Sequence, residues 1–125
     1  MNPFKMIKAM FTSTPGATPA DAAARVGAKE ALLIDVRESG EWTSGVAEHA
    51  ILLPLSDLSG ARARWRPFLA AHDGRELLCY CAAGGRSAIA ARILAAEGFR
   101  TANAGSLAEW SSAGWPVVPP AKATR

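Results

Sequence analysis

The chain has 125 residues, half of them hydrophobic, and a formal net charge of +3. This length and composition suit one compact domain whose core needs no disulfide framework. Because the positive charge forms no basic block and no apolar run approaches a membrane span, neither nucleic acid nor a bilayer is indicated as a partner.

Residues 1–17 are predicted to be an N-terminal extension of the domain. Phe4, Ile7 and Met10 are spaced for one helical face, which is compatible with one or two helical turns packed on the domain. A membrane-surface role is the less favoured alternative, because packing explains the same pattern.

The first clear helix start is formed by Thr18, Pro19 and Asp21. They supply an N-cap, a proline at the first helical position and a first-turn acid, so a helix is predicted to about Val26. The next apolar run, residues 32–36, is too short for a helix and is predicted to be a buried strand.

Asp35 and Arg37 fall at the carboxyl end of this strand, where open parallel sheets bind ligands. Arg37 could face the site as a cation or form an ion pair with Asp35 or Glu41. Asp35 could orient Arg37 or Arg86, or cap the following turn. The sequence leaves these roles open.

Two further elements are expected before the middle of the chain. Residues 38–43 suit a short helical turn anchored by Trp42, and residues 50–53 suit a second buried strand that stops at Pro54. Residues 56–71 have an apolar helical face and are predicted to form one helix. The arginines around its Trp65 suit a solvated face better than a nucleic-acid contact.

The second half repeats the alternation of strand and helix. Residues 77–81 are predicted to be a strand, residues 86–97 a helix and residues 99–103 a weaker strand. Ser106 and Glu109 have the spacing of a capping box, which predicts a short helix. A proline-containing tail, residues 119–125, is predicted to fray.

The fold predicted from this alternation is α/β, with a central parallel sheet of about five strands flanked by helices on both faces. The domain is expected to span residues 18–118. The carboxyl ends of its strands would bring Asp35, Arg37 and Cys81 to one crevice.

Cys81 stands at the junction between a strand and a helix, in the stretch LLCYCAAGGRS of residues 77–87. A helix start offers unpaired N–H groups and a partial positive charge, and Gly84 and Gly85 permit positive φ, so the loop can form an anion nest. Arg86 adds a cation. Lowering a cysteine pKa from ~8.5 to ~6.5 raises its ionised fraction at pH 7 from about 3% to roughly three quarters.

The loop resembles the active-site motif C-x-x-G-x-R of the rhodanese family of sulfurtransferases. Residues 32–37, LLIDVR, resemble the family's strand ending in D-x-R, and residues 38–42, ESGEW, resemble the acidic turn after it. Residues 105–110, GSLAEW, and 113–117, AGWPV, are similar to the family's G-G-x-x-x-W and A-G-x-P-V stretches. Together these matches span about residues 18–118.

The resemblance implies sulfur transfer through a persulfide on Cys81, from a donor such as thiosulfate or another persulfide to a thiol, cyanide or protein acceptor. It requires no metal and no organic cofactor. Asp35 and Arg37 are candidate supporting residues. The implied active-site loop contains Cys81, Ala82, Ala83, Gly84, Gly85, Arg86 and Ser87.

Several alternatives accompany this interpretation. Phosphatases of the cysteine type need a C-x5-R cradle for phosphate, whereas the present C-x4-R loop favours sulfur. A relay module fed by a partner's persulfide, or a non-catalytic domain, would have the same fold. Ala82 and Ala83 offer no charge for a sulfonate, and the oligomeric state is not indicated.

Three other residues have structural interpretations. Cys79 is predicted to be a buried apolar thiol. Val46 takes the place of the family's usual histidine, and His49, three residues later, is expected to be a surface or structural residue. Because Cys79 and Cys81 are poorly placed to bridge, free thiols and a cytoplasmic location are expected.

Overall fold

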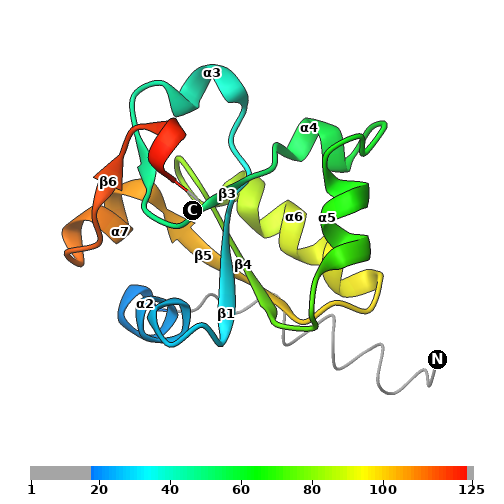
Figure 1. The fold of residues 1–125 in the computed structure, drawn as a ribbon, viewed down its shortest axis with the longest axis horizontal. Coiled ribbons are helices and arrows are strands. Elements are labelled where there is room, and N and C mark those ends of the chain that lie inside the picture. Colours follow the sequence, from blue (N-terminus) through cyan, green and yellow to red (C-terminus); the bar gives the residue numbers. More distant parts are fainter. Residues whose placement is uncertain (1–17, 124–125) are drawn as a thin grey trace.

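The computed structural model describes residues 18–123, which form a central sheet with helices on both faces (Figure 1). The sheet has four parallel strands in the order β3-β1-β4-β5. Their bounds are Ile51–Leu52 for β3, Ala31–Asp35 for β1, Glu76–Cys81 for β4 and Thr101–Ser106 for β5. The α/β class and the parallel sheet are confirmed, with four strands in this sheet where about five were predicted.

Two short strands form a separate antiparallel pair at the side of the main sheet. They are β2, Val46–Ala47, and β6, Val117–Val118. Between β1 and β2 lies the short helix α3, Ser39–Trp42, as the sequence predicted. This part of the chain projects beyond the carboxyl end of β1 (Figure 1).

The central strands β1 and β4 are apolar in their middle residues because helices cover both of their faces. Helices α2, Pro19–Gly27, and α7, Leu107–Ser112, pack on one face, where Tyr80 and Trp110 are fully buried. The other face is covered by α4, Leu55–Leu58, α5, Trp65–Ala71, and α6, Gly85–Ala96 (Figure 1). Its core includes the buried Trp65 and Leu94.

The predicted helix caps are present. The hydroxyl of Thr18 accepts the backbone N–H of Asp21 at the start of α2. Ser106 and Glu109 form the expected capping box at the start of α7. These local signals were sufficient because each cap involves residues only three positions apart.

The prediction of a single helix over residues 56–71 is wrong, because residues 59–64 are not helical. Helix α4 ends at Leu58, and α5 begins only at Trp65. Between them the carboxylate of Asp57 accepts the backbone N–H groups of Ala63, Arg64 and Trp65 at 2.9 to 3.0 Å. An aspartate that bonds to nearby backbone competes with the helical pattern, and this one stabilises a turn instead.

The carboxyl-terminal segment also differs from its prediction. Residues 120–122 form a 3-10 helix, Pro120–Lys122, rather than a frayed end. Ala123 is buried and packs with Trp42 and Val46, because the segment covers the apolar side of α3 and β2. The predicted N-terminal extension and the last two residues lie outside the described residues.

The register of the sheet sets the position of the candidate site. β1 pairs with β4 from Ala31 opposite Glu76 to Asp35 opposite Tyr80. The carboxyl ends of the two central strands therefore lie next to each other, and Cys81 follows directly. Within residues 18–123, no helix has the length and apolar character needed to cross a membrane.

Candidate active site

The sulfur of Cys81 lies at the end of β4, where residues 82–84 turn the chain into α6. It accepts backbone N–H groups from Gly84 at 3.0 Å and Ser87 at 3.4 Å. The hydroxyl oxygen of Ser87 lies 3.4 Å from the sulfur. The sulfur is therefore surrounded by dipoles at the start of a helix of 12 residues.

These contacts determine the acidity of the thiol. Burial alone would raise the pKa of Cys81, but hydrogen bonds from the Ser87 hydroxyl and from the N–H groups of Ser87, Ala83 and Gly84 outweigh it. The pKa of Cys81 is thus lowered from its ordinary value. A lowered pKa raises the thiolate fraction, and the thiolate is the nucleophilic form.

The two glycines of the loop have different roles. Gly84 has φ +95°, the left-handed conformation that favours glycine, and caps α6 with its N–H directed at the sulfur. Gly85 is the first residue of α6, and a Cβ added to it would meet nothing within 4 Å. The sequence predicted that both glycines could adopt positive φ, but only Gly84 does so.

Ala82 and Ala83 are exposed, whereas Ser87 is fully buried. The two alanines therefore form the open side of the loop and contribute no charge to it. Ser87 faces inward and donates hydrogen bonds rather than lining the entrance. The loop residues named from the sequence are thus divided between an apolar rim and a polar interior.

Arg86 extends away from the sulfur toward α3. Its two terminal nitrogens contact both carboxylate oxygens of Glu41, at 2.5 and 2.9 Å. This paired hydrogen bond lowers the pKa of Glu41 to about 2 and raises the pKa of Arg86. Roughly a third of each side chain is exposed. The pair links the start of α6 to α3. The guanidinium of Arg86 is therefore bound to Glu41 rather than directed at the sulfur.

Asp35 and Arg37 form a buried ion pair and do not face the crevice. Arg37 donates to the Asp35 carboxylate from its backbone N–H, its Nε and one terminal nitrogen, at 2.8 to 3.1 Å. It also donates to the carbonyl of Gly45 at 2.8 Å. Of the two roles that the sequence left open for Arg37, the geometry favours the ion pair. Asp35 likewise orients Arg37 and caps the following turn, and Arg86 is held by Glu41 instead.

Tyr80 and Trp42 complete this buried cluster. The Tyr80 hydroxyl donates to Asp35 at 2.6 Å and accepts the N–H of Ala47 at 2.9 Å. The indole N–H of Trp42 donates to Asp35 at 3.3 Å. Burial raises the pKa of Tyr80, and the nearby Asp35 carboxylate raises it further. The cluster fastens α3 and β2 over the ends of the strands, and the sequence did not single out Tyr80 for this role.

Cys79 is fully buried, two residues before Cys81 on the same strand. Burial raises its pKa to about 12, so Cys79 stays protonated near neutral pH. Its environment agrees with the prediction of an apolar structural thiol.

Asn103 is a site residue that sequence reasoning missed. It lies on β5, pairs in register with Cys79, and its amide oxygen accepts the hydroxyl of Ser87 at 2.7 Å. A polar side chain among the small residues of this strand was the available signal. What the sequence could not supply was the register that brings Asn103 to Ser87.

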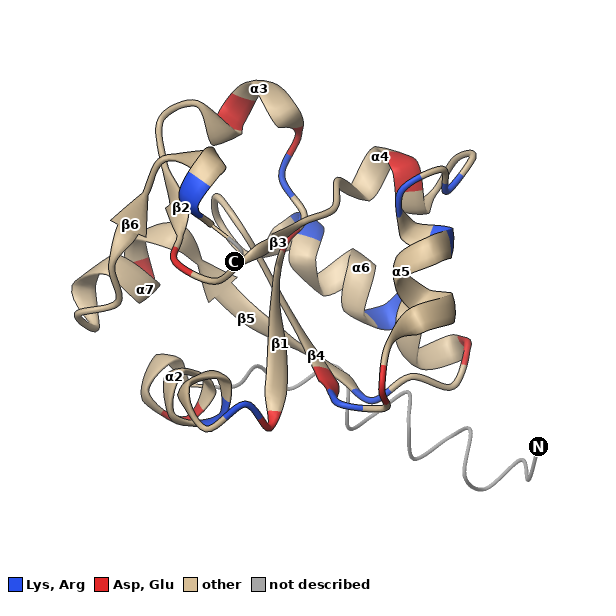
Figure 2. Cartoon of the chain, in the orientation of Figure 1, with Lys and Arg blue, Asp and Glu red and all other residues tan. Residues whose placement is uncertain are grey.

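The charged residues are distributed over several elements rather than gathered on one (Figure 2). Arg62 forms a two-pronged pair with Glu97 at 2.7 Å, and the guanidinium of Arg64 lies 5.7 Å from the ring centroid of Trp42. Two of the arginines around Trp65 are therefore engaged within the domain. Residues 18–123 contain no cluster of three or more side chains suited to hold a metal ion.

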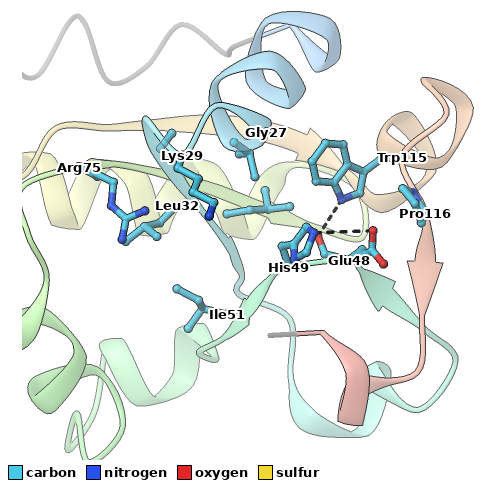
Figure 3. A pocket seen from close by; sticks show the side chains of 12 residues that line it. Gly27, Lys29, Leu32, Glu48, His49, Ile51, Arg75, Trp115 and Pro116 are labelled. Atoms are coloured by element: carbon cyan, nitrogen blue, oxygen red, sulfur yellow. Dashed lines mark hydrogen bonds and ion pairs between the residues drawn. The ribbon is translucent and has the colours of Figure 1, made fainter. Parts of the chain in front are cut away.

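A separate pocket of about 320 Å³ lies beside the amino-terminal half of β1, remote from the cysteine loop (Figure 3). Its lining includes Leu32, Ile51, Trp115, His49 and Lys29. The indole N–H of Trp115 donates to the carbonyl of Glu48 at 2.8 Å. None of the predicted site residues lines this pocket. His49, which was expected to be a surface or structural residue, is one of the residues that line this pocket.

A model of the rhodanese-like domain family matches residues 18–113. No curated protein matches the chain by sequence.

Solved structures with the same architecture include three informative relatives. A rhodanese-related protein from Thermoplasma volcanium is 29% identical with a TM-score of 0.68, over 82% of this chain and 96% of that one. The human single-domain sulfurtransferase TSTD1 is 28% identical with a TM-score of 0.60, over 78% and 96%. A thiosulfate sulfurtransferase from Pseudomonas aeruginosa, 22% identical with a TM-score of 0.68 over 97% of this chain and 23% of that one, shares the fold.

Proposed function

The chain belongs to the rhodanese-like domain family, and from this premise we propose that it is a sulfurtransferase that carries sulfur as a persulfide on Cys81. The observation that supports this most directly is the set of N–H and O–H groups directed at one buried sulfur. They favour the anionic form of Cys81, which is the form needed to attack a sulfur atom.

In the first step the Cys81 thiolate attacks the outer sulfur of the donor. With thiosulfate, the new S–S bond forms as the old one breaks, and sulfite leaves with the electron pair of the broken bond. The product is a Cys81 persulfide whose negative charge lies on the outer sulfur. The reaction follows thiol–disulfide exchange and needs no oxidant, because the sulfur arrives already at the required oxidation level.

In the second step an acceptor nucleophile attacks the outer sulfur. Cyanide, for example, takes that sulfur as thiocyanate and returns the thiolate of Cys81. The exposed Ala82 and Ala83 leave the outer side of the loop open to such an acceptor. Backbone N–H groups at the start of α6 would stabilise the sulfur anion, as fixed dipoles stabilise developing charge in other active sites.

The decisive experiment is an intact-mass measurement after incubation with thiosulfate. We expect a gain of one sulfur atom, which cyanide removes with release of thiocyanate. Cys81→Ser should show neither the gain nor turnover. Cys79→Ser is the matched control, because the same substitution two residues earlier should leave loading intact.

Two outcomes would contradict the proposal. One is a protein that gains no sulfur from either thiosulfate or a low-molecular-weight persulfide. The other is an equal gain in Cys81→Ser, which would place the sulfur elsewhere. A non-catalytic domain would also show an ordinary thiol pKa for Cys81 when the ultraviolet absorbance of its thiolate is titrated.

A second candidate concerns the donor. The two arginines at the predicted site, Arg37 and Arg86, are both bound to carboxylates. The Arg37 pair is buried, and roughly a third of the Arg86 side chain is exposed. Thiosulfate carries two negative charges and would have to compete with Glu41 for Arg86. A persulfide donor, on a small thiol or on a partner protein, has no sulfonate to accommodate. This favours a sulfur-relay role with weak thiosulfate turnover.

The donors can be compared by their second-order rate constants for loading Cys81. The relay proposal expects loading by glutathione persulfide to exceed loading by thiosulfate. Equal or faster loading by thiosulfate would remove its support while leaving sulfur transfer itself intact. The expected cytoplasmic location fits either donor, because reducing conditions keep both cysteines as thiols.

A further inference from the structure

The Ser87 hydroxyl has one proton and several acceptors within reach. Its oxygen lies 2.7 Å from the amide oxygen of Asn103, 3.1 Å from the carbonyl of Gly84 and 3.5 Å from the carbonyl of Gly105. The sulfur of Cys81 lies at 3.4 Å. A hydroxyl can donate to only one strong acceptor at a time. Three oxygens therefore compete with the sulfur for that proton.

Asn103 is the strongest of these competitors because its amide is fixed. The amide oxygen also accepts the N–H of Gly105 at 3.0 Å, and the amide nitrogen donates to the carbonyl of Gly84 at 3.0 Å. If the amide were flipped, its nitrogen would face the N–H of Gly105 and its oxygen would face the carbonyl of Gly84, so both hydrogen bonds would be lost. The amide oxygen is thus held toward Ser87.

A bulge in β5 produces this placement. Cys79 pairs with Asn103, whereas Cys81 pairs with Ser106, so β5 has one residue more than β4 over the same length. Gly105 takes up the extra residue with φ +85°. Bulges of this kind redirect side chains next to functional sites. Ser87 is fully buried, so water does not readily replace either partner.

We propose that Asn103 is a positioning residue for Cys81: its amide oxygen competes with the sulfur for the Ser87 proton and so restrains formation of the thiolate. In the neutral state the thiol donates to Ser87, and Ser87 donates to Asn103. In the anionic state the hydroxyl turns to the sulfur, and the amide oxygen of Asn103 keeps only the N–H of Gly105 as a donor.

This inference rests on the proposed function for its meaning in a reaction cycle. When Cys81 becomes a persulfide, the charge moves to the outer sulfur, and the inner sulfur becomes a weak acceptor. The Ser87 proton then returns to Asn103. Asn103 therefore favours the loaded enzyme over the free thiolate by the strength of that one hydrogen bond.

The other titratable groups around the sulfur come from several elements and are unchanged by substitutions at Asn103. Arg86 of α6 interacts with Cys81 electrostatically and is itself paired with Glu41 of α3. Cys79 lies on the same strand and stays neutral well above pH 7. The Asp35 cluster lies at the end of the neighbouring β1. A change in the acidity of Cys81 can therefore be assigned to the Ser87 proton.

The test substitutes Asn103→Leu, which keeps a similar volume and removes the acceptor. We expect the pKa of Cys81 to fall by about half a unit to one unit, the worth of one net hydrogen bond. A damaged loop would instead lose N–H donors and raise the pKa. The measurement is a pH titration of thiolate absorbance, corrected with Cys81→Ser, and it requires no sulfur donor.

The assignment to Ser87 is tested by a double-mutant cycle. Ser87→Ala should raise the pKa of Cys81, and in that background Asn103→Leu should lower it no further. Asn103→Asp, which offers a stronger acceptor and a charge, should raise it. Thr101→Val, an isosteric change on the same strand, is the control and should leave the titration unchanged.

An unchanged or raised pKa in Asn103→Leu would overturn the proposal, as would an equal fall in the Ser87→Ala background. Asn103→Ala repeats the test if the leucine variant does not fold. The titration stands apart from catalysis, so failure of sulfur transfer would refute the proposed function without touching this result. Conversely, a normal sulfur-loading assay with an unchanged titration would refute only the role of Asn103.

Discussion

The ends of β1 and β4 lie side by side, and each holds an anionic group in a different way. Asp35 is neutralised by the guanidinium of Arg37 and is completely buried. The sulfur of Cys81 is held by N–H and O–H dipoles from its own loop. In the first arrangement the charge of Asp35 is neutralised by a cation, and in the second the dipoles of the loop stabilise the sulfur anion.

The difference comes from the length and direction of the chain after each strand. Arg37 follows Asp35 by two residues and folds back onto it through both backbone and side chain. Arg86 follows Cys81 by five residues and turns outward to Glu41. A longer loop leaves its backbone N–H groups facing inward, which allows an anion to persist without a bound cation.

The largest effect is expected from breaking the Asp35 cluster. Arg37→Met leaves a buried carboxylate without its cation and should lower the free energy of unfolding by about 3–5 kcal/mol. Arg75→Met is the control, since its pair with Asp73 is exposed and should contribute less than about 1 kcal/mol. Urea denaturation of both variants measures this. Similar losses in the two variants would show that charge neutralisation does not hold the cluster together.

The next effect should come from the cysteine loop. Gly84→Ala forces a side chain into the left-handed conformation, at a cost of about 1–3 kcal/mol, and should slow sulfur loading about tenfold to a hundredfold. Gly85→Ala replaces a glycine already in helical conformation and should change loading less than about twofold. If both variants lose activity equally, the inward direction of the Gly84 N–H is not what matters.

Cys79 shows the effect of burial when it outweighs the hydrogen bonding to the thiol. Its pKa in the folded state, about 12, lies above its ordinary value of 9.0, so the folded protein keeps a proton that the unfolded chain releases. Between these pH values stability should fall by about 1.4 kcal/mol per pH unit. Urea denaturation of Cys79→Ala across this range should lack that slope.

Cys81 should contribute with the opposite sign. Because its folded-state pKa is lowered, its stabilisation is complete above the unfolded pKa and is lost as the pH falls through the folded pKa. Comparing Cys81→Ser with the wild type should show stability rising with pH in that window. A slope of the same sign for both cysteines would contradict the contrast between them.

The smallest effect is expected at the Arg86–Glu41 pair. Glu41→Gln weakens the hold on Arg86 and should raise the rate of loading by thiosulfate by up to about fivefold, the equivalent of an exposed ion pair. Loading by glutathione persulfide should stay nearly constant, which makes it the internal control. A fall in both rates would mean that the pair maintains the loop rather than restricting the donor.

Much of the fold was predictable because its signals are local. The apolar runs at residues 32–36 and 77–81 became the central strands, and the caps at Thr18 and Ser106 formed as expected. The break after Leu58 was missed because a helical pattern does not reveal that Asp57 bonds to backbone six to eight residues later. The 3-10 helix at Pro120–Lys122 was likewise missed, because the residue after it, Ala123, packs on Trp42 and Val46, which are distant in the sequence.

The position of Cys81 in its loop was predictable from the sequence, whereas the surroundings of that loop were not. The role of Cys81 as a nucleophile stays a prediction. Cys81 and its dipoles follow from a strand that runs into a helix through glycine. The direction of Arg37, the partner of Arg86 and the place of Asn103 depend on which strands pair and in what register. A single sequence contains no direct signal of that register, so residues far apart in the chain could not be matched.

The partial exposure of Arg86 and Glu41 has a consequence for the conditions around the protein. Dissolved ions screen exposed charges over about 8 Å at physiological ionic strength and about 3 Å at 1 M. The bridge from α3 to α6 should therefore loosen in concentrated salt, while the buried Asp35–Arg37 pair is shielded from those ions. A rise in ionic strength should thus weaken the Arg86–Glu41 pair beside the cysteine loop and leave the buried Asp35–Arg37 pair unaltered.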